Sequence, residues 1–327
     1  MIKAAYIAEW NFDEIKSQDK KILTHVNFAF AVIKNGKANI EHWKDKEKIK
    51  QFNKEKEHIK SVLSIGGWGA GGFSPAVATE NGRQELANSL VEISNDYEFD
   101  GIDLDWEYPG DDVAGIEASK NDKVNFTLLM NLLREKIGTQ KILSMAVGGS
   151  QKCIDNLELE KLVNVVDFIN LMTYDMCPWD KVGYHTALYD SYQDVSSCDK
   201  VVKLYNQAGV PNNKLVLGAA FYSRVYKNVD GIDSKIEKTT PDFLNGGYKA
   251  SVQFSKECEN GEQYDEKAET AWAYNTQKRE FITYDNPRSI RAKVEYVNKK
   301  KLAGIMFWEY DHDDEESSLI RGLEISI

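Results

Sequence analysis

Cysteine, histidine and long hydrophobic runs are all scarce in this sequence of 327 residues. Its four cysteines are too few and too scattered for a disulfide framework or a zinc site, so we expect free thiols. Its five histidines show no metal-ligand spacing, which argues against a histidine metal centre. No apolar run approaches the roughly 18 residues that a membrane-spanning helix needs. The sequence therefore predicts neither a cysteine- or histidine-bound metal nor a membrane span.

Basic residues are also in the minority, and the formal net charge is −11. Such an acidic chain is not expected to bind nucleic acid or anionic membranes. The length suits one large domain or a barrel with an insertion, and we expect a monomer. Residues 1–3 lead straight into an apolar stretch, without the features of a signal peptide. We expect an extracellular protein if an export segment was removed before this numbering starts, and a cytoplasmic one otherwise.

The most informative stretch is residues 100–109, Asp-Gly-Ile-Asp-Leu-Asp-Trp-Glu-Tyr-Pro, in which acidic and apolar residues alternate. Alternate side chains of a β-strand share one face, so Asp103, Asp105 and Glu107 point the same way. Successive acids lie about 6.6–6.8 Å apart along a strand. Like charges at that distance repel by roughly 2.5 kcal/mol at an effective dielectric constant near 20. Because a strand is expected to keep acids that repel one another only where they serve a function, the pattern indicates a functional strand.

Three interpretations of this acidic face differ in what the opposite face and the flanks require. A solvated edge strand is disfavoured, because its other face carries Ile102, Leu104 and Trp106, which need to be buried. A Mg²⁺ or Ca²⁺ site could use carboxylate ligands, but no glycine-rich ion loop lies nearby. We favour catalysis by the acids themselves, without a metal or another cofactor.

Strand-like runs recur along the whole chain and alternate with helix-like segments such as 122–137 and 290–300. The eight predicted strands are Ala4–Trp10, His25–Val32, Ser61–Gly66, Gly101–Glu107, Ile142–Val147, Phe168–Tyr174, Leu215–Tyr222 and Gly304–Glu309. Regular alternation implies right-handed parallel crossovers, and eight such units predict a (β/α)₈ TIM barrel. The active site of such a barrel lies at the carboxyl ends of its strands. Polar and aromatic residues gather at those ends in this sequence, as expected for a site that binds sugar.

One crossover, after the seventh strand, is too long for a loop. Residues 225–283 read as an inserted α+β module with strand-like pieces at 248–254, 271–274 and 280–284. The barrel would then comprise residues 1–224 and 284–327. We expect the module to wall one side of the substrate cleft, although an insertion away from the site fits the sequence too.

With these motifs in hand, the chain resembles the chitinases of glycoside hydrolase family 18. The acidic strand matches the family pattern Asp-x-x-Asp-x-Asp-x-Glu at Asp100 to Glu107. The third strand carries the Ser-x-Gly-Gly motif at residues 64–67, and the sixth carries Met-x-Tyr-Asp at residues 172–175. Trp308 matches the tryptophan of the eighth strand, and the insertion resembles the module of the subgroup with deep clefts.

The resemblance implies a chitinase that hydrolyses β-1,4-linked N-acetylglucosamine polymers through substrate-assisted, retaining catalysis. Glu107 would be the general acid and base, Asp105 would orient the 2-acetamido group, Asp103 would support Asp105, and Tyr174 would donate to the acetamido oxygen. The geometry agrees, since acids on one face of one strand cannot attack a sugar from opposite sides. The implied substrate-binding positions are Tyr6, Phe30, Gly67, Trp68, Met172, Asp175, Tyr222, Arg224 and Trp308.

Two other activities stay open for this sequence. An endo-β-N-acetylglucosaminidase acting on glycoproteins or peptidoglycan would share the acidic strand. A chitin-binding lectin would bind sugar without cutting it, but such proteins typically lose the acid that is present here as Glu107. The expected partners of the favoured chitinase are chitin or N-acetylglucosamine oligosaccharides.

Overall fold

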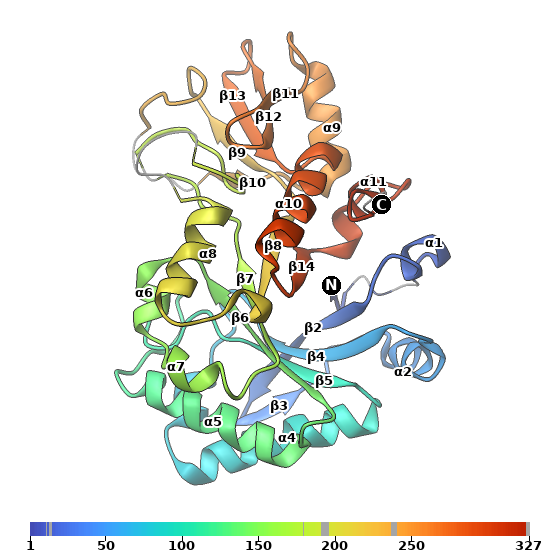
Figure 1. The fold of residues 1–327 in the computed structure, drawn as a ribbon, viewed down its shortest axis with the longest axis vertical. Coiled ribbons are helices and arrows are strands. Elements are labelled where there is room, and N and C mark those ends of the chain that lie inside the picture. Colours follow the sequence, from blue (N-terminus) through green and yellow to red (C-terminus); the bar gives the residue numbers. More distant parts are fainter. Residues whose placement is uncertain (11, 13–14, 179, 191–195, 237–240, 325–327) are drawn as a thin grey trace.

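The fold is a closed barrel of parallel strands with helices around it (Figure 1). The computed structural model describes residues 1–10, 12, 15–178, 180–190, 196–236 and 241–324. The barrel strands are β1 (Ile2–Ala8), β2 (His25–Lys34), β4 (Lys60–Gly66), β5 (Gly101–Asp105), β6 (Ile142–Gly148), β7 (Phe168–Met172), β8 (Leu215–Ala220) and β14 (Gly304–Trp308). Strand β1 pairs in parallel with both β2 and β14, which closes the sheet. The predicted TIM barrel is confirmed.

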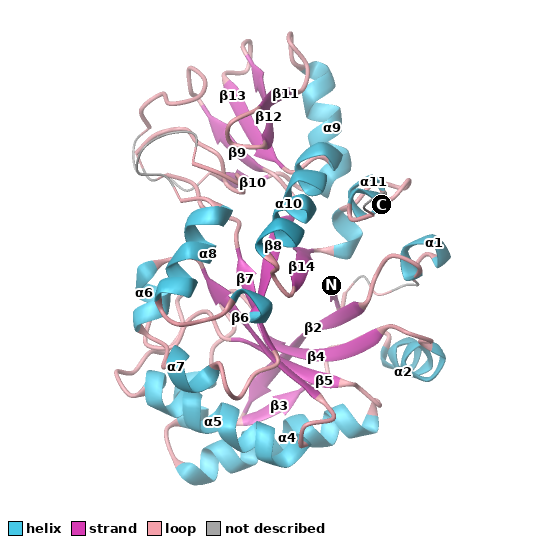
Figure 2. Ribbon diagram, in the orientation of Figure 1, coloured by secondary structure: helices cyan, strands magenta, loops and turns pink. Residues whose placement is uncertain are grey.

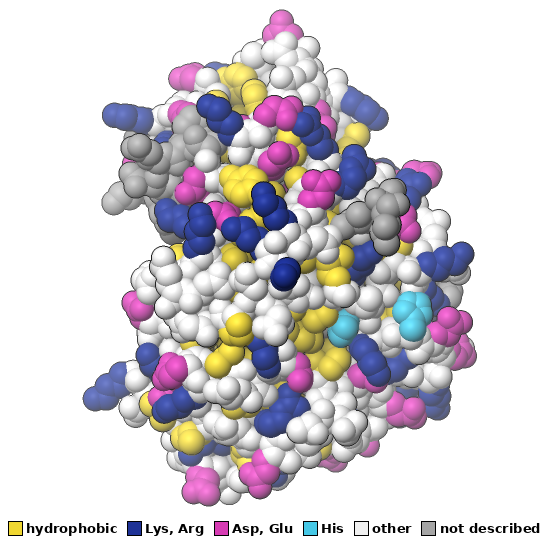
Figure 3. Space-filling model, viewed as in Figure 1, with side chains coloured by type: hydrophobic (Ala, Val, Ile, Leu, Met, Phe, Trp, Pro, Cys, Tyr) yellow, Lys and Arg dark blue, Asp and Glu magenta, His cyan; other side chains and the backbone are white. Residues whose placement is uncertain are grey.

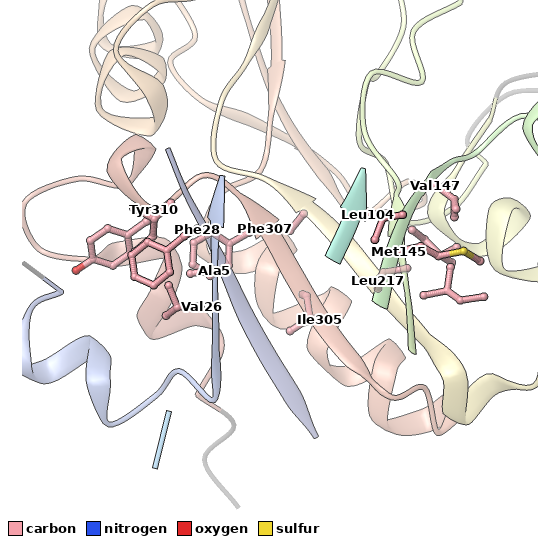
Figure 4. Close-up of a cluster of buried hydrophobic side chains, with 14 of the residues drawn as sticks. Ala5, Val26, Phe28, Leu104, Met145, Val147, Leu217, Ile305, Phe307 and Tyr310 are labelled. Atoms are coloured by element: carbon pink, nitrogen blue, oxygen red, sulfur yellow. The ribbon is translucent and has the colours of Figure 1, made fainter. Parts of the chain in front are cut away.

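Helices cover the outer face of the barrel (Figure 2). A layer of buried apolar side chains fills the space between the strands and the helices. The longer helices are α2 (Lys46–Glu55), α4 (Glu80–Asp96), α5 (Asp122–Ile137), α8 (Cys198–Gln207) and α10 (Pro287–Lys300). The shorter ones are α1 (Ser17–Lys20), α3 (Phe73–Val77), α6 (Gln151–Asp155), α7 (Leu159–Leu162) and α11 (Ser318–Gly322), with 3₁₀ turns η1 (Asn212–Lys214) and η2 (Tyr310–His312). A short strand β3 (Lys37–Asn39) pairs antiparallel with β2. Figure 4 shows outward-facing residues of this layer, among them Phe28 of β2, Leu104 of β5 and Phe307 of β14.

The segment between β8 and α10 forms a second, antiparallel sheet beside the barrel (Figure 2). It contains β9 (Arg224–Lys227), β10 (Asp242–Phe243), α9 (Gly247–Glu257), β11 (Gln263–Asp265), β12 (Thr270–Asn275) and β13 (Glu280–Tyr284). The predicted strand at 248–254 is wrong, because this stretch belongs to helix α9. Its buried positions Tyr248, Ser251 and Ser255 are spaced by three and four, the period of a helix. Part of the predicted module, residues 237–240, lies outside the described residues, and its boundaries at 225 and 283 stay a prediction.

A buried ion pair anchors the end of this second sheet to the barrel. Lys293 of α10 and Asp285, which follows β13, form a salt bridge with both side chains fully buried. Asp285 Oδ2 also accepts a hydrogen bond of 3.1 Å from the backbone N–H of Ala220, the last residue of β8. Lys293 Nζ donates to Thr186 Oγ1 at 2.6 Å. Helix α10, β8 and the strand β13 are therefore held at one point.

The surface carries both signs of charge. Acidic and basic side chains are mixed over the face shown in Figure 3. In the part of the chain that the structure describes, none of the helices combines the length and the apolar character that crossing a membrane requires.

Candidate active site

The acidic residues of β5 point into the barrel, while their neighbours point outward. Trp106 stacks on Phe73 of α3 with ring centroids 5.1 Å apart, on the helix-covered side. Asp103 accepts a 2.9 Å hydrogen bond from the Tyr6 hydroxyl of β1 instead, across the barrel interior. Because β5 lies between β4 and β6 and its acids are buried, the solvated edge strand is excluded. The predicted division of the strand into an acidic and an apolar face is confirmed.

Four donors saturate the carboxylate of Asp103, which is fully buried. Tyr6 and Ser64 donate to Oδ2 at 2.9 and 2.8 Å, and Ser144 and Asn170 donate to Oδ1 at 2.6 and 3.2 Å. Burial raises the pKa of Asp103, and these hydrogen bonds oppose the increase. The network fixes the acid strand against strands β1, β4, β6 and β7.

Ser144 and Asn170 were not among the residues predicted from the sequence. Each is a polar residue inside an otherwise apolar strand, Ile142–Gly148 and Phe168–Met172 respectively. Ser144 is also the parallel partner of Asp103 in the sheet. An unexplained polar residue in a buried strand was the signal that could have identified both.

Asp105 and Glu107 are buried next to each other at the end of β5. Burial, followed by the charges of Glu107 and Asp103, raises the pKa of Asp105 well above its usual value. Burial, assisted by the charge of Asp175, raises the pKa of Glu107 to about 7. Asp105 Oδ1 is buried and has no hydrogen-bond partner among the described residues. The pair can therefore hold a proton near neutral pH and still offers an unused acceptor.

A second group lies at the ends of β7 and β8. The Arg224 Nε–H donates to Asp175 Oδ1 at 2.6 Å, and His185 Nδ1 lies 3.6 Å from the same oxygen. Burial alone would raise the pKa of Asp175, but its interactions with the nearby His185 ring and with the hydrogen-bonded Arg224 guanidinium outweigh burial and hold that pKa below its usual range. The rings of Tyr174 and Tyr222 meet edge to face with centroids 6.0 Å apart. The structure thus brings four predicted residues together, of which Asp175 supplies the carboxylate, and His185 adds a contact that the sequence did not reveal.

Aromatic rings form the remaining part of the site. Trp308 stacks on Phe30 with centroids 5.4 Å apart and planes at 15°, and Tyr6 lies within 6.1 Å of Trp308. Met172 belongs to the same cluster. Gly67 is required here: its φ is +90°, and a Cβ atom would lie 2.7 Å from the Phe30 ring. These residues together supply a flat apolar surface beside the acids.

The last predicted residue, Trp68, differs from the others in its exposure. Its side chain is 64% exposed, and its ring meets Tyr108 edge to face at 6.4 Å. Tyr108 directly follows Glu107, so Trp68 lies at the outer margin of the site. Within the described residues, no three His, Cys, Asp or Glu side chains are grouped so that they could hold a metal ion. The arrangement suits proton transfer and sugar binding.

Comparison with known proteins extends this result. Residues 3–313 match the family model described as glycosyl hydrolases family 18. The chain is 34% identical to chitinase A1 of Niallia circulans over 298 residues, covering 81% of this chain and 42% of that protein. It is 31% identical to probable chitinase 2 of Drosophila melanogaster over 346 residues, covering 95% of this chain and 70% of that protein. A solved structure of a family 18 N-acetylglucosaminidase from Paenibacillus barengoltzii superimposes with a TM-score of 0.89 and 36% identity, over 98% of each chain. The chain thus spans less than half of chitinase A1.

Proposed function

The chain belongs to glycosyl hydrolases family 18 and is a glycoside hydrolase, and we propose that it is a chitinase that cleaves β-1,4-linked N-acetylglucosamine polymers. The observation that carries this proposal is the position of Glu107. Its buried carboxyl has a pKa raised to about 7, and it lies two residues beyond β5, the strand whose acids face the barrel interior. A carboxyl with such a pKa suits a general acid near neutral pH.

The proposed reaction is substrate-assisted, the exception to the usual two-carboxylate mechanism. The substrate's own 2-acetamido carbonyl oxygen attacks C1 while Glu107 gives its proton to the leaving oxygen, forming an oxazolinium ion. Glu107 then takes a proton from water as that water attacks C1, which restores the acid and retains the configuration. Each half-reaction returns the proton that the other consumes.

Neighbouring residues would hold the acetamido group during this reaction. The unpartnered Asp105 Oδ1 supports a role as acceptor for the acetamido N–H, on which positive charge develops. Tyr174 would donate its hydroxyl to the acetamido oxygen, and Trp308 would lie beneath the sugar ring. Asp103 would act on Asp105 through its charge, which raises the pKa of Asp105.

A second candidate is an N-acetylglucosaminidase that releases single sugars from chain ends. It is favoured by the full-length likeness to the Paenibacillus barengoltzii protein, which is described as an N-acetylglucosaminidase. Cleavage of glycoproteins or peptidoglycan, and sugar binding without cleavage, gain no support from a specific contact. We further propose that the protein acts as a monomer, and that the second sheet walls one side of the substrate cleft because β9 begins at the site residue Arg224.

The test compares the wild type with the Glu107→Gln variant on chitin hexamer, on fully deacetylated chitosan and on a cellulose oligomer. We expect cleavage of the acetylated substrate alone, and a loss of about 10²–10⁴-fold in the variant because an amide cannot protonate the leaving group. Products of two or more sugars would identify a chitinase, and single sugars only would identify the second candidate. Rapid cleavage of deacetylated chitosan, or more than a tenth of wild-type activity in the variant, would refute the mechanism.

A further inference from the structure

Among the described residues, the exposed tryptophan and phenylalanine rings all lie in one region of the protein. Of the described tryptophan and phenylalanine side chains, three are exposed: Trp10 at 51%, Trp68 at 64% and Phe243 at 38%. Trp10 lies two residues beyond β1 and Trp68 two residues beyond β4, at the carboxyl ends of these strands. Phe243 belongs to the second sheet but pairs with Arg224, near the carboxyl end of β8. All three rings are therefore associated with the active-site rim.

Phe243 contacts residues of the site directly. Its ring centroid lies 5.2 Å from that of Tyr222 and 5.6 Å from that of His312. The guanidinium carbon of Arg224 lies 5.9 Å from the Phe243 ring. Tyr222 in turn meets Tyr174, the proposed acetamido donor. Phe243 thus adds one more ring to the aromatic series that starts beside the acids.

The backbone around Phe243 holds this ring in place. The N–H of Leu244 donates to the carbonyl of Ser223 at 3.2 Å. At Gly247, where α9 begins and φ is +59°, a Cβ atom would lie 2.3 Å from the carbonyl oxygen of His312. The chain that follows Phe243 is therefore fixed against the ends of β8 and β14, and the Asp242–Phe243 strand itself pairs with β9. A partly exposed aromatic ring that is held by its neighbours is preorganised for binding, because little side-chain entropy is lost.

We propose that Phe243 is a sugar-binding residue that stacks on the apolar face of an N-acetylglucosamine unit beyond the unit that is cleaved. This inference rests on the proposed function and adds a residue that the sequence motifs did not indicate. The exposed part of the ring is apolar surface that a pyranose ring would remove from water. Since this sugar lies outside the catalytic pocket, Phe243 affects the binding of long oligosaccharides and contributes little to that of short ones.

The experiment measures dissociation constants for the N-acetylglucosamine dimer and hexamer by titration calorimetry. The parent is Glu107→Gln, which prevents cleavage, and it is compared with the same protein carrying Phe243→Ala, Phe243→Leu or Phe243→Tyr. We expect the alanine and leucine variants to bind the hexamer about tenfold more weakly, and the tyrosine variant to stay within about twofold. Affinity for the dimer is expected to change by less than about twofold.

Leucine separates stacking from packing, because it retains an apolar contact with Tyr222 but offers no flat ring. Leu128→Ala is the matched control, since Leu128 is an exposed apolar residue (45%) on the outer helix α5. Thermal melting verifies that each variant is folded. Hexamer binding by the leucine variant equal to that of the parent, or equal weakening for dimer and hexamer, overturns the role of Phe243 alone. A parent that binds neither oligosaccharide overturns the proposed function as well.

Discussion

Raising the pH from 6 to 8 should lower the rate of hydrolysis about tenfold, because the proposed reaction needs the proton on Glu107. The pKa of this residue is raised to about 7 by burial and by the charge of Asp175. A group with that pKa is about nine-tenths protonated at pH 6 and about one-tenth protonated at pH 8. The Asp175→Asn variant lacks this charge, so the pKa of Glu107 should fall. The decline in rate on the alkaline side of the pH–rate profile (the alkaline limb) should then occur at lower pH.

The same proton affects stability, so the assay has to separate the two effects. The folded-state pKa of Glu107 lies above the value of 4.5 for an unperturbed glutamate. Its contribution to stability is therefore fully present below about pH 4.5 and is lost as the pH rises through about 7. Melting temperatures are recorded at every pH. The value of kcat/KM is then measured with an uncharged fluorogenic oligosaccharide, at a temperature far below the lowest melting temperature.

A second buried carboxyl, that of Glu309, serves as the control for assigning the pH dependence of the rate to Glu107. Burial also raises the pKa of Glu309 to about 7, and Glu309 Oε2 accepts a 3.1 Å hydrogen bond from the N–H of Ala8. If Glu107 is responsible, the Glu309→Gln variant keeps the alkaline limb near pH 7. A limb that disappears in this variant, or a wild-type rate that stays constant to pH 9, would refute the reasoning.

Three further predictions concern the supporting structure. Asn170→Ala removes one donor from the Asp103 carboxylate; a hydrogen bond to a charged group contributes about 1.5–3 kcal/mol, so kcat should fall at least about tenfold. An unchanged kcat in a folded Asn170→Ala variant would contradict a supporting role of this hydrogen bond in catalysis. Lys293→Met leaves Asp285 buried without its cation and should cost about 3 kcal/mol, the lower end of the usual range because other donors remain, or about 5 °C in melting temperature. The control variant Lys299→Met changes an exposed residue of the same helix and should shift the melting temperature by less than about 1 °C. Equal shifts in the two variants would contradict burial of Lys293 as the cause of the destabilisation. Exhaustive chelation should leave the rate unchanged, and a loss restored by Ca²⁺ or Mg²⁺ would revive a metal site.

The positions of the barrel strands are predictable because each is a short run of apolar residues or, in β5, of alternating acidic and apolar residues. Several of the strand ends are not predictable in this way. The alternation of acidic and apolar residues predicts a strand that reaches Glu107, yet β5 ends at Asp105. The last pair between β4 and β5 joins Gly66 to Asp105, and Gly66 then turns away with a φ of +121°. Beyond this point β4 offers no partner to residue 106. Sheet pairing depends on the neighbouring strand, which the hydrophobic pattern of one segment does not encode.

The site was predictable where chemistry left a local pattern and not where it depended on distant contacts. Asp103, Asp105 and Glu107 alternate along one strand, so their common orientation followed from the sequence. His185 belongs to no such pattern, and its proximity to Asp175 arises only when the loop after β7 folds back. The sequence predicts a strand at 248–254, where the structure has helix α9, because the apolar residues of this stretch are few and its burial depends on the second sheet.

Closure of the barrel links the first strand of the chain to the last. Ile2 pairs with Gly304, so about three hundred residues must be synthesised before β1 finds its second neighbour. Until then β1 presents an open edge, which other chains can pair with. The strand that closes this edge, β14, also carries Trp308. Covering this exposed strand edge and placing Trp308, the proposed floor of the active site, are therefore a single late folding event. A ribosome-bound or truncated chain that lacks β14 is expected to be both inactive and prone to aggregate.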